Sequence, residues 1–373
     1  MTNISSKSMT KDQELNSAFL IAFTGGGSAG HVTPNLALID AWSKVGGASF
    51  YIGRANSVES SLLNNYKQIE FCSIPSERLR RYFHWGNFIM PFIVCVGVLK
   101  SIWILRKRRP KLLFSKGGFV SLPVVIGAWF NRIPVIVHES DGSLGLANRL
   151  SLPFTQIVCL GQERARSNVK HKCIHVTGSP LRSDFYESNA QAAIEHYSLN
   201  PQRKLLLVFG GSLGARQINE TVWLSLDKLL LSYEIIHVVG QGNLSPEHGE
   251  RFQDQAYHQV EYISEGFADL LSAAHLVVCR AGANAVAELI TLQKPALLVP
   301  LSSLSSRGDQ TINAEEFVSC GGGVMIDNES FTSSNLTQAL QSLEESHSQH
   351  VEALSQHTQS NSTQAIIDIF KMI

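Results

Sequence analysis

Short apolar runs alternate with helix-like stretches along the whole chain. In the first half these runs lie at 18–24, 49–53, 112–116, 134–138, 156–160 and 173–177. In the second half they lie at 204–209, 234–239, 260–263, 276–279, 295–300 and 323–326. Continuous apolar strands separated by helices are typical of parallel sheets that are covered on both faces. The pattern predicts an α/β protein with two doubly wound, Rossmann-like domains.

Both halves begin alike, with a strand, a glycine-rich turn and a helix, in "FTGGGSAGH" and "VFGGSLGAR". Between them, "VTGSPLRSDF" ends a strand in turn residues and marks the boundary. The expected parts are a polar, disordered lead-in, an N-terminal domain, a C-terminal domain and a last helix that can pack back on the N-terminal domain, at 1–17, 18–180, 181–355 and 356–373. Because ligands of such folds bind beyond the carboxyl ends of the strands, we expect the site in the cleft between the halves.

Composition narrows the class of protein. Of 373 residues 44% are hydrophobic and 17% are charged, which suits a folded chain. The formal net charge is zero, so no overall field attracts nucleic acid, and we expect no nucleic-acid partner. Six cysteines are scattered without a C-x-x-C pair or zinc-ligand spacing, which predicts reduced thiols and no metal site. The polar first seventeen residues lack the apolar core of a signal peptide.

The apolar segment "FIMPFIVCVGVLKSIWIL", at 88–105, is at the lower limit of what can span a bilayer. Pro91 and Lys100 interrupt it, and basic residues flank both ends, so no charge asymmetry orients a span. One interpretation is a buried helix packed on a sheet. The other, which we favour, is a helix that touches an anionic membrane surface through 78–105. The preceding cations and aromatics suit such an anchor, namely Arg78, Arg80, Arg81, Tyr82, Phe83 and Trp85.

The first glycine turn, with Gly25, Gly27 and Gly30, fits the dinucleotide pattern G-x-G-x-x-G. That pattern needs an acidic residue at the end of the second strand, where this chain has Gly53 and Arg54. An arginine can accept the 2′-phosphate of NADP, so an NADP oxidoreductase stays as an alternative. A second glycine loop, which one dinucleotide does not need, counts against it.

Four glycine-containing turns follow strands, at 25–30, 116–121, 210–214 and 280–288. Their backbone N–H groups and the helices that follow favour anions, which predicts phosphate-rich ligands. His31 lies at a helix N-terminus, where the dipole favours the neutral imidazole of a general base. It can instead pack or cap locally.

Two other helix starts carry candidate sugar-binding groups. Glu288 can accept both hydroxyls of a ribose, although alone it would suit a solvated helix face. Farther along, Gln310 and Asn313 suit sugar hydroxyls, while Asp309 can cap its helix.

From about residue 18 to its C-terminus the chain resembles the MurG family of bacterial glycosyltransferases. The resemblance rests on "GGSAGHVTP", "KGGFVSLP", "HESDGSLGLANR", "GSPLR", "FGGSLGAR", "CRAGANAVAE" and "RGDQTINA". It implies an inverting enzyme of GT-B architecture, without a cofactor, that moves N-acetylglucosamine (GlcNAc) from UDP-GlcNAc to undecaprenyl-diphosphate-linked N-acetylmuramoyl-pentapeptide (lipid I). The product would be lipid II for peptidoglycan. The implied location is peripheral, on the cytoplasmic face of the cell membrane.

The resemblance also assigns roles to residues. His31 would be the catalytic base. The donor would be bound by Ser28, Gly30, Arg182, Gly211, Ser212, Gly214, Ile263, Gly282, Ala283, Asn284, Glu288, Gln310 and Asn313. The acceptor would be bound by Gly27, Gly117, Gly118, Glu139 and Asp141. No D-x-D motif is present, so loop amides, a helix dipole and Arg182 are expected to stabilise the leaving diphosphate without a metal.

The chain departs from the family pattern at two places. It has Glu139-Ser140-Asp141 where the family often has Glu-Gln-Asn, and Asp309-Gln310 where Gln-Gln is common. The first departure puts an added carboxylate near the acceptor diphosphate, which is costly unless the charge is paired. Asp141 is therefore also a rival base or a partner of His31. A related transferase with another acceptor, and a non-catalytic membrane-docking subunit, are the remaining alternatives.

Overall fold

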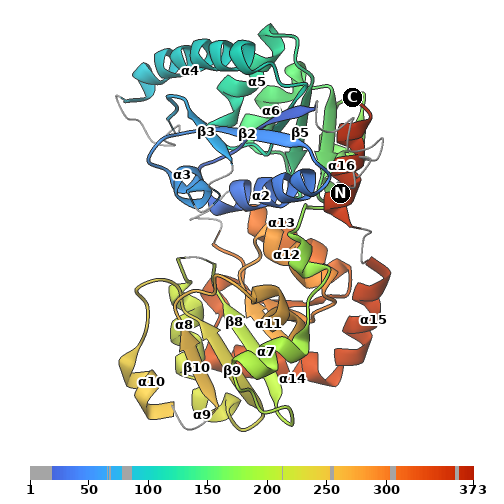
Figure 1. Cartoon of the computed structure of the whole chain (residues 1–373). Coiled ribbons are helices and arrows are strands. Elements are labelled where there is room, and N and C mark those ends of the chain that lie inside the picture. The colour runs from blue at the N-terminus through green and yellow to red at the C-terminus, as the bar shows by residue number, and fades with distance from the viewer. Residues whose placement is uncertain are drawn as a thin grey trace, which may run out of the picture. The chain divides into compact units, whose positions relative to one another are not determined.

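The computed structural model describes residues 19–64, 66, 69–77, 86–211, 213–252, 256–302, 308–357 and 361–373. The expected lead-in at 1–17, Ser212 and the basic–aromatic stretch at 78–85 lie outside the described residues. The chain forms two compact units (Figure 1). The first contains the residues up to Arg182 together with Asn361–Ile373, and the second is Ser183–Ser360.

The first unit contains a seven-stranded parallel sheet in the order β3-β2-β1-β4-β5-β6-β7. Its strands are β1 (Leu20–Thr24), β2 (Ala48–Gly53), β3 (Glu70–Ser73), β4 (Leu112–Ser115), β5 (Val135–Glu139), β6 (Ile157–Leu160) and β7 (Ile174–Val176). Its helices are α2 (Ala29–Lys44), α3 (Val58–Leu63), α4 (Gly86–Arg108), α5 (Ser121–Phe130), α6 (Leu146–Ser151) and α16 (Ser362–Lys371), with short 3₁₀ turns η1 (Leu152–Phe154) and η2 (Glu163–Asn168).

Alternate residues of β1 face two different cores, as expected for a strand covered on both sides. Phe23 belongs to a core with α2 and α16, whereas Ala22 belongs to a core with α4 and α5. The C-terminal helix α16 lies beside α2 in Figure 1. Its Phe370 ring meets those of Trp42 and Phe114 edge-on, with centroids 6.1 Å and 5.4 Å away. The last helix of the chain thus completes the hydrophobic core of the first unit.

The second unit contains a six-stranded parallel sheet in the order β10-β9-β8-β11-β12-β13. Its strands are β8 (Lys204–Phe209), β9 (Tyr233–Val238), β10 (Tyr257–Val260), β11 (Leu276–Cys279), β12 (Ala296–Leu298) and β13 (Gly323–Met325). Its helices are α7 (Ala190–His196), α8 (Arg216–Trp223), α9 (Leu226–Leu229), α10 (Pro246–Phe252), α11 (Phe267–Ala273), α12 (Ala283–Thr291), α13 (Asp309–Ser319), α14 (Ser333–Glu345) and α15 (His347–His357), with 3₁₀ turns η3 (Ser183–Phe185) and η4 (Asn328–Ser330). One face of this sheet packs against α8, α9 and α14.

The prediction of two doubly wound parallel sheets is confirmed, with two corrections. The first sheet has a strand that was not predicted, β3 (Glu70–Ser73), a four-residue edge strand with one exposed and three half-buried residues. The strand predicted at 260–263 ends at Val260 and begins at Tyr257. Both errors concern edge strands, where one side of the strand lacks a neighbour and the sequence is less continuously apolar.

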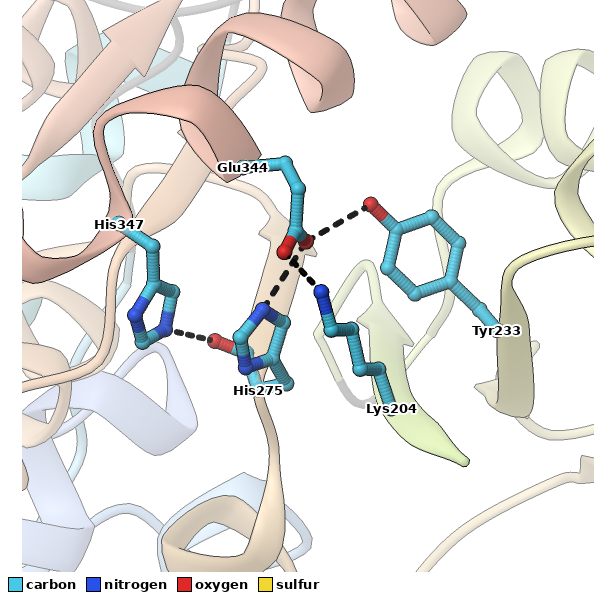
Figure 2. Close-up of polar contacts among 5 residues, drawn as sticks. All are labelled: Lys204, Tyr233, His275, Glu344 and His347. Atoms are coloured by element: carbon cyan, nitrogen blue, oxygen red, sulfur yellow. Dashed lines mark hydrogen bonds and ion pairs between the residues drawn. The ribbon is translucent and has the colours of Figure 1, made fainter. Parts of the chain in front are cut away.

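A polar cluster joins the amino ends of three strands of the second unit to the helices α14 and α15 (Figure 2). The Glu344 carboxylate forms an ion pair with Lys204, accepts a hydrogen bond from the Tyr233 hydroxyl (3.4 Å) and lies 2.9 Å from His275 Nε2. The His275 and His347 rings stack at 4.0 Å, and His347 Nε2 lies 3.1 Å from the His275 carbonyl. Because Glu344 of α14 contacts residues at the amino ends of three strands, this cluster connects α14 to the sheet.

Candidate functional site

In the first unit the two glycine loops meet where the strand order reverses, between the carboxyl ends of β1 and β4. Gly26 N donates a hydrogen bond to Gly117 O at 3.3 Å. Gly117 and Gly118 have φ of +92° and +85°, and a Cβ on Gly118 would lie 2.1 Å from the Gly26 carbonyl oxygen. Only glycine allows both the left-handed backbone and this close approach. Such a switch point is where ligands of this fold bind.

The first turn of α2 adds donor groups at this point. Ser28 is the N-cap residue, and its side chain does not cap the helix. Gly27, Ser28 and Gly30 are exposed, and His31 is half-buried at the third helical position. The backbone N–H groups of a helix start favour an anion, and the imidazole lies at the same end of the helix.

A buried glutamate that was not predicted holds the first glycine loop. Glu59 in α3 is fully buried, and its carboxylate accepts hydrogen bonds from Gly27 N (3.3 Å) and Arg54 N (3.2 Å). A Cβ on Gly26 would lie 2.6 Å from the same carboxylate. The segment "VESSLL" resembles an ordinary surface helix, so only the tertiary structure identifies Glu59 as the anchor of this loop.

Glu139, at the end of β5, is only 4% exposed. Its carboxylate accepts hydrogen bonds from Asp141 N (3.3 Å), Gly145 N (2.9 Å) and Asn148 Nδ2 (2.9 Å). Burial, and secondarily the charge of Asp141, raise the pKa of Glu139. The Glu139 carboxylate is thus hydrogen-bonded to the backbone of the loop that contains the half-buried Asp141.

Lys116, directly before the second glycine loop, is also buried, with 1% exposure. Its ammonium lies 2.9 Å from His138 Nδ1 and donates to Ser140 Oγ, which accepts a further hydrogen bond from Ser179 Oγ at 2.8 Å. Burial lowers the pKa of Lys116 to about 8, while the charges of Glu139 and Asp141 act in the opposite direction. A buried cation next to the second glycine loop was not predicted.

In the second unit three helices begin at the carboxyl edge of neighbouring strands, β8, β11 and β12. These helices are α8, α12 and α13, and none of their N-cap residues forms a side-chain cap. The strand order again reverses between β8 and β11. The uncapped starts therefore present N–H groups and positive dipole ends at one edge of the sheet, as a diphosphate requires.

A pocket of about 710 Å³ lies at this edge. Of the predicted donor residues it is lined by Gly214 and Gln310. Gln310 Oε1 accepts a hydrogen bond from Leu301 N at 2.8 Å, which leaves the amide –NH₂ to face a ligand. The pocket also contains polar residues that were not predicted, namely Arg216, Gln217, Glu220, Arg280, Ser302 and Asn328.

The Arg280 side chain of this pocket is held in place by two backbone carbonyls. Its Nη1 donates to Val299 O (3.0 Å) and Pro300 O (3.2 Å), and burial lowers the pKa of its guanidinium. Asn328 Oδ1 is buried without a hydrogen-bond partner in the described part of the chain. The signal for Arg280 was in the sequence, since it directly precedes the turn at 281–284.

The other predicted donor residues are not among those that line this pocket. Gly211 has φ +96°, and Gly282, Ala283 and Asn284 form the start of α12, which also carries the half-buried Glu288. Asn313 is fully buried and donates to Ala281 O at 3.2 Å, and Ile263 is half-buried beyond the end of β10. Arg182 belongs to the first unit, where its charge acts on Asp40, whose pKa burial raises. The roles of these residues stay predictions.

The helix α4 extends the predicted apolar segment to Gly86–Arg108. One face packs on α5, with Ser101 and Leu105 fully buried. The other face exposes large apolar side chains at helical spacing, Phe92 (72%), Val96 (54%), Leu99 (66%) and Trp103 (61%). The helix is therefore buried on one face and exposed on the other. No helix in the described ranges is long and apolar enough to cross a bilayer.

Comparison with known proteins agrees with the two-unit architecture. Residues 21–159 match the glycosyltransferase family 28 N-terminal domain, and residues 205–369 match the family 28 C-terminal domain. The crystal structure of MurG from Acinetobacter baumannii covers 95% of this chain and all of its own with a TM-score of 0.76, at 23% identity. At that identity the likeness shows a shared fold.

Two sequence relatives extend the match to nearly the whole chain. Both are named UDP-N-acetylglucosamine–N-acetylmuramyl-(pentapeptide) pyrophosphoryl-undecaprenol N-acetylglucosamine transferases. The one from Clostridium kluyveri is 42% identical and covers 94% of this chain and 98% of its own. The other, transferase 2 of Bacillus thuringiensis subsp. konkukian, is 40% identical over 93% and 97%. The chain belongs to glycosyltransferase family 28 and, within it, to the MurG family.

Proposed function

We propose that this protein transfers GlcNAc from UDP-GlcNAc to lipid I, with inversion at the sugar carbon, and so forms lipid II for peptidoglycan. The observation that carries the proposal is 40–42% identity over more than nine-tenths of the chain to transferases named for this reaction. The two glycine-rich switch points support it, since both substrates contain a diphosphate.

The second unit is the proposed donor site. The diphosphate of UDP-GlcNAc binds at the start of α8, near Gly211, Ser212 and Gly214, and Arg280 supplies positive charge in the same pocket. Glu288 accepts the ribose hydroxyls, and Ile263 contacts the uracil. The –NH₂ group of Gln310 donates to a hydroxyl of GlcNAc.

Asn313 has a different role in this proposal. Because it is fully buried and donates to the Ala281 carbonyl, it holds the segment that leads into α12. It thus positions Glu288, which lies in that helix.

The first unit is the proposed acceptor site. Gly27, Gly117, Gly118 and the start of α2 bind the diphosphate of lipid I through backbone N–H groups. His31 takes the proton of the acceptor hydroxyl as that oxygen attacks the anomeric carbon of GlcNAc and the bond to UDP breaks. Loop amides and helix starts stabilise the charge that develops on the departing UDP.

The exposed apolar face of α4 is the proposed contact with the membrane that holds the lipid acceptor. The side chains of Phe92, Leu99 and Trp103 would enter the interfacial region while basic residues meet anionic headgroups. The protein would then act peripherally, on the cytoplasmic face of the membrane where UDP-sugars are made available.

A related transferase with another lipid-linked acceptor is the second candidate. The observation that favours it is the sequence Glu139-Ser140-Asp141 over the buried Lys116, because an altered charge pattern beside the acceptor loops can change the acceptor. This alternative keeps the donor and changes only the acceptor.

Replacing Glu288 tests the donor half of the proposal. Glu288→Ala should raise the Kd of UDP-GlcNAc at least about tenfold, because hydrogen bonds to a carboxylate are worth about 1.5–3 kcal/mol. Titration calorimetry measures this directly, and Glu250→Ala, an exposed glutamate of α10, is the matched control. Unchanged affinity in Glu288→Ala would remove Glu288 from the donor site. Tight binding of NADP by the wild type, without any response to UDP, would overturn the proposed transferase activity.

Replacing His31 tests the base. His31→Ala should lower kcat by about 10² or more while UDP-GlcNAc binding stays nearly intact, because only the proton transfer is lost. His175→Ala, on the exposed side of the edge strand β7, should leave kcat unchanged. An equal loss of binding and turnover in His31→Ala would make His31 a structural residue.

A further inference from the structure

In the second unit, the glycine loop at 210–214 (the diphosphate loop) touches the loop that follows β9. A Cβ on Gly240 would lie 2.3 Å from Gly214 N, and a Cβ on Gly214 would lie 2.0 Å from Val239 O. The two glycines have φ of +93° and +75°. Neither position therefore accepts another residue without displacing the neighbouring loop. The loop at 240–245 lies directly against the loop that the proposed donor site requires.

One side chain, that of Asn243, joins these two loops. Its Nδ2 donates to Leu213 O in the diphosphate loop at 3.1 Å. The same nitrogen donates to Val239 O at 3.3 Å and to Gln241 O at 3.4 Å in its own loop. In the first unit the two glycine loops are joined by a backbone hydrogen bond, which no substitution removes directly. Here the connection depends on a single side-chain amide.

The hydrogen bond from Asn243 fixes one peptide group of the diphosphate loop at both ends. This group links Leu213 to Gly214. Its carbonyl accepts from Asn243, and its N–H donates to Gly211 O at 2.9 Å. A carbonyl oxygen repels a phosphate, whereas the N–H groups of a glycine loop attract it. By holding Leu213 O on the neighbouring loop, Asn243 prevents this oxygen from turning toward an anion.

The loop that contains Asn243 is itself attached to the sheet. Glu261, directly after β10, accepts a hydrogen bond from Gly242 N at 2.7 Å. Gln259, within β10, accepts from Ser245 N at 3.0 Å and donates to Ser245 O at 2.6 Å. These three hydrogen bonds hold the loop on both sides of Asn243. The side-chain amide therefore reaches the diphosphate loop from a fixed support.

On the basis of the proposed donor site, we propose that Asn243 is a positioning residue for the diphosphate of the sugar nucleotide. It fixes the Leu213 carbonyl and so keeps the diphosphate loop ready to bind an anion, without touching the reacting atoms. Asn243 is exposed and does not belong to the hydrophobic core of the second unit, so its removal leaves that core intact. Its effect is therefore expected on the phosphates of the ligand and not on the nucleoside.

The test compares a ligand that contains the diphosphate with one that lacks it. The Kd of UDP is measured by titration calorimetry and that of uridine by ligand-observed NMR, for the full-length wild type and Asn243→Ala. The matched control is Asn131→Ala in the first unit. Asn131 Nδ2 also donates to backbone carbonyls, those of Ile102 at 3.1 Å and Gly127 at 2.9 Å. Melting temperatures of all three proteins show that they are folded during the binding measurements.

We expect Asn243→Ala to raise the Kd of UDP at least about fivefold and to change that of uridine by less than about twofold. Asn131→Ala should leave both values nearly unchanged. An unchanged Kd of UDP in Asn243→Ala, or equal losses for UDP and uridine, would overturn the positioning role. So would an equal loss of UDP affinity in Asn131→Ala. A wild type that binds neither UDP nor UDP-GlcNAc would instead overturn the proposed donor site itself.

Discussion

At the residue scale, two buried charged side chains lie next to the two glycine loops of the first unit. Glu59 accepts from the backbone of the first glycine loop, and Lys116 lies beneath the second. The nearest partners of the Lys116 ammonium, His138 and Ser140, supply no negative charge. The charges of Glu139 and Asp141 act to raise the pKa of this ammonium, and the ammonium acts to lower the pKa of Glu139. We expect Lys116 to compensate the added carboxylate at position 141, because its pKa responds to the charge of Asp141.

Removing the charge of Lys116 should therefore disturb the acceptor side and spare the donor side. Lys116→Met should lower kcat/KM for the lipid acceptor at least about tenfold with unchanged Kd for UDP-GlcNAc, because an uncompensated carboxylate then repels the diphosphate. Adding Asp141→Asn should restore most of the loss. Steady-state kinetics of both variants check this, with Lys170→Met as an exposed control. A double variant no better than Lys116→Met would contradict the coupling.

At the element scale, the contact between the two glycine loops shapes the proposed acceptor site. Gly118 and Gly46 have the same φ, +85°, but a Cβ on Gly46 would meet nothing within 4 Å. Both substitutions by alanine lose glycine's freedom, and only Gly118→Ala also collides with a backbone carbonyl.

Gly118→Ala should therefore destabilise the protein by about 2 kcal/mol or more beyond the effect of Gly46→Ala, because the carbonyl of Gly26 must move. It should also weaken acceptor binding. Urea unfolding of the two variants under identical conditions measures the difference. Equal unfolding free energies would mean that the two loops are not held in contact.

Most elements follow from the sequence because a buried parallel strand is a continuous apolar run. The central strands β1, β4, β8 and β11 agree with the predicted runs to within two residues. The edge strand β3 was missed because Glu70 and Ser73 interrupt its apolar character. The two faces of α4 were not separable, since its sequence is apolar all round.

The candidate site could be predicted only where its residues form a continuous motif. The glycine loops and helix starts are such motifs, because local backbone geometry requires them. Glu59 and Lys116 could not be identified, because each acts on a partner more than twenty residues away. A single buried charge has no periodic signal in the sequence.

At the scale of the whole molecule, buried neutral histidines couple stability to pH. His237 is fully buried between Asn219 and Tyr257, and burial lowers its pKa to about 3. Above pH 6.5 both folded and unfolded states are neutral at this residue. As the pH falls below 6.5, the unfolded state binds the proton and the folded state does not, so stability falls until the pH reaches the folded pKa.

As the pH falls from 7 to 5, His237 should lower the free energy of unfolding by about 2 kcal/mol. Below pH 6.5 the loss is about 1.4 kcal/mol per pH unit. In His237→Gln this part of the pH dependence should vanish, whereas His196→Gln, at an exposed position, should retain it. Unfolding midpoints of the three proteins across that pH range provide the measurement. An unchanged pH slope in His237→Gln would show that His237 is protonated in the folded state.

The central claim is tested most directly by transfer of radiolabelled GlcNAc from UDP-GlcNAc to a lipid I analogue in detergent, with EDTA present. We predict a labelled disaccharide lipid, which would establish donor and acceptor together and show that Ser140 and Asp141 are compatible with this acceptor. Binding of UDP-GlcNAc without any labelled product would contradict the proposed acceptor. It would direct attention to the loop that begins at Asp141.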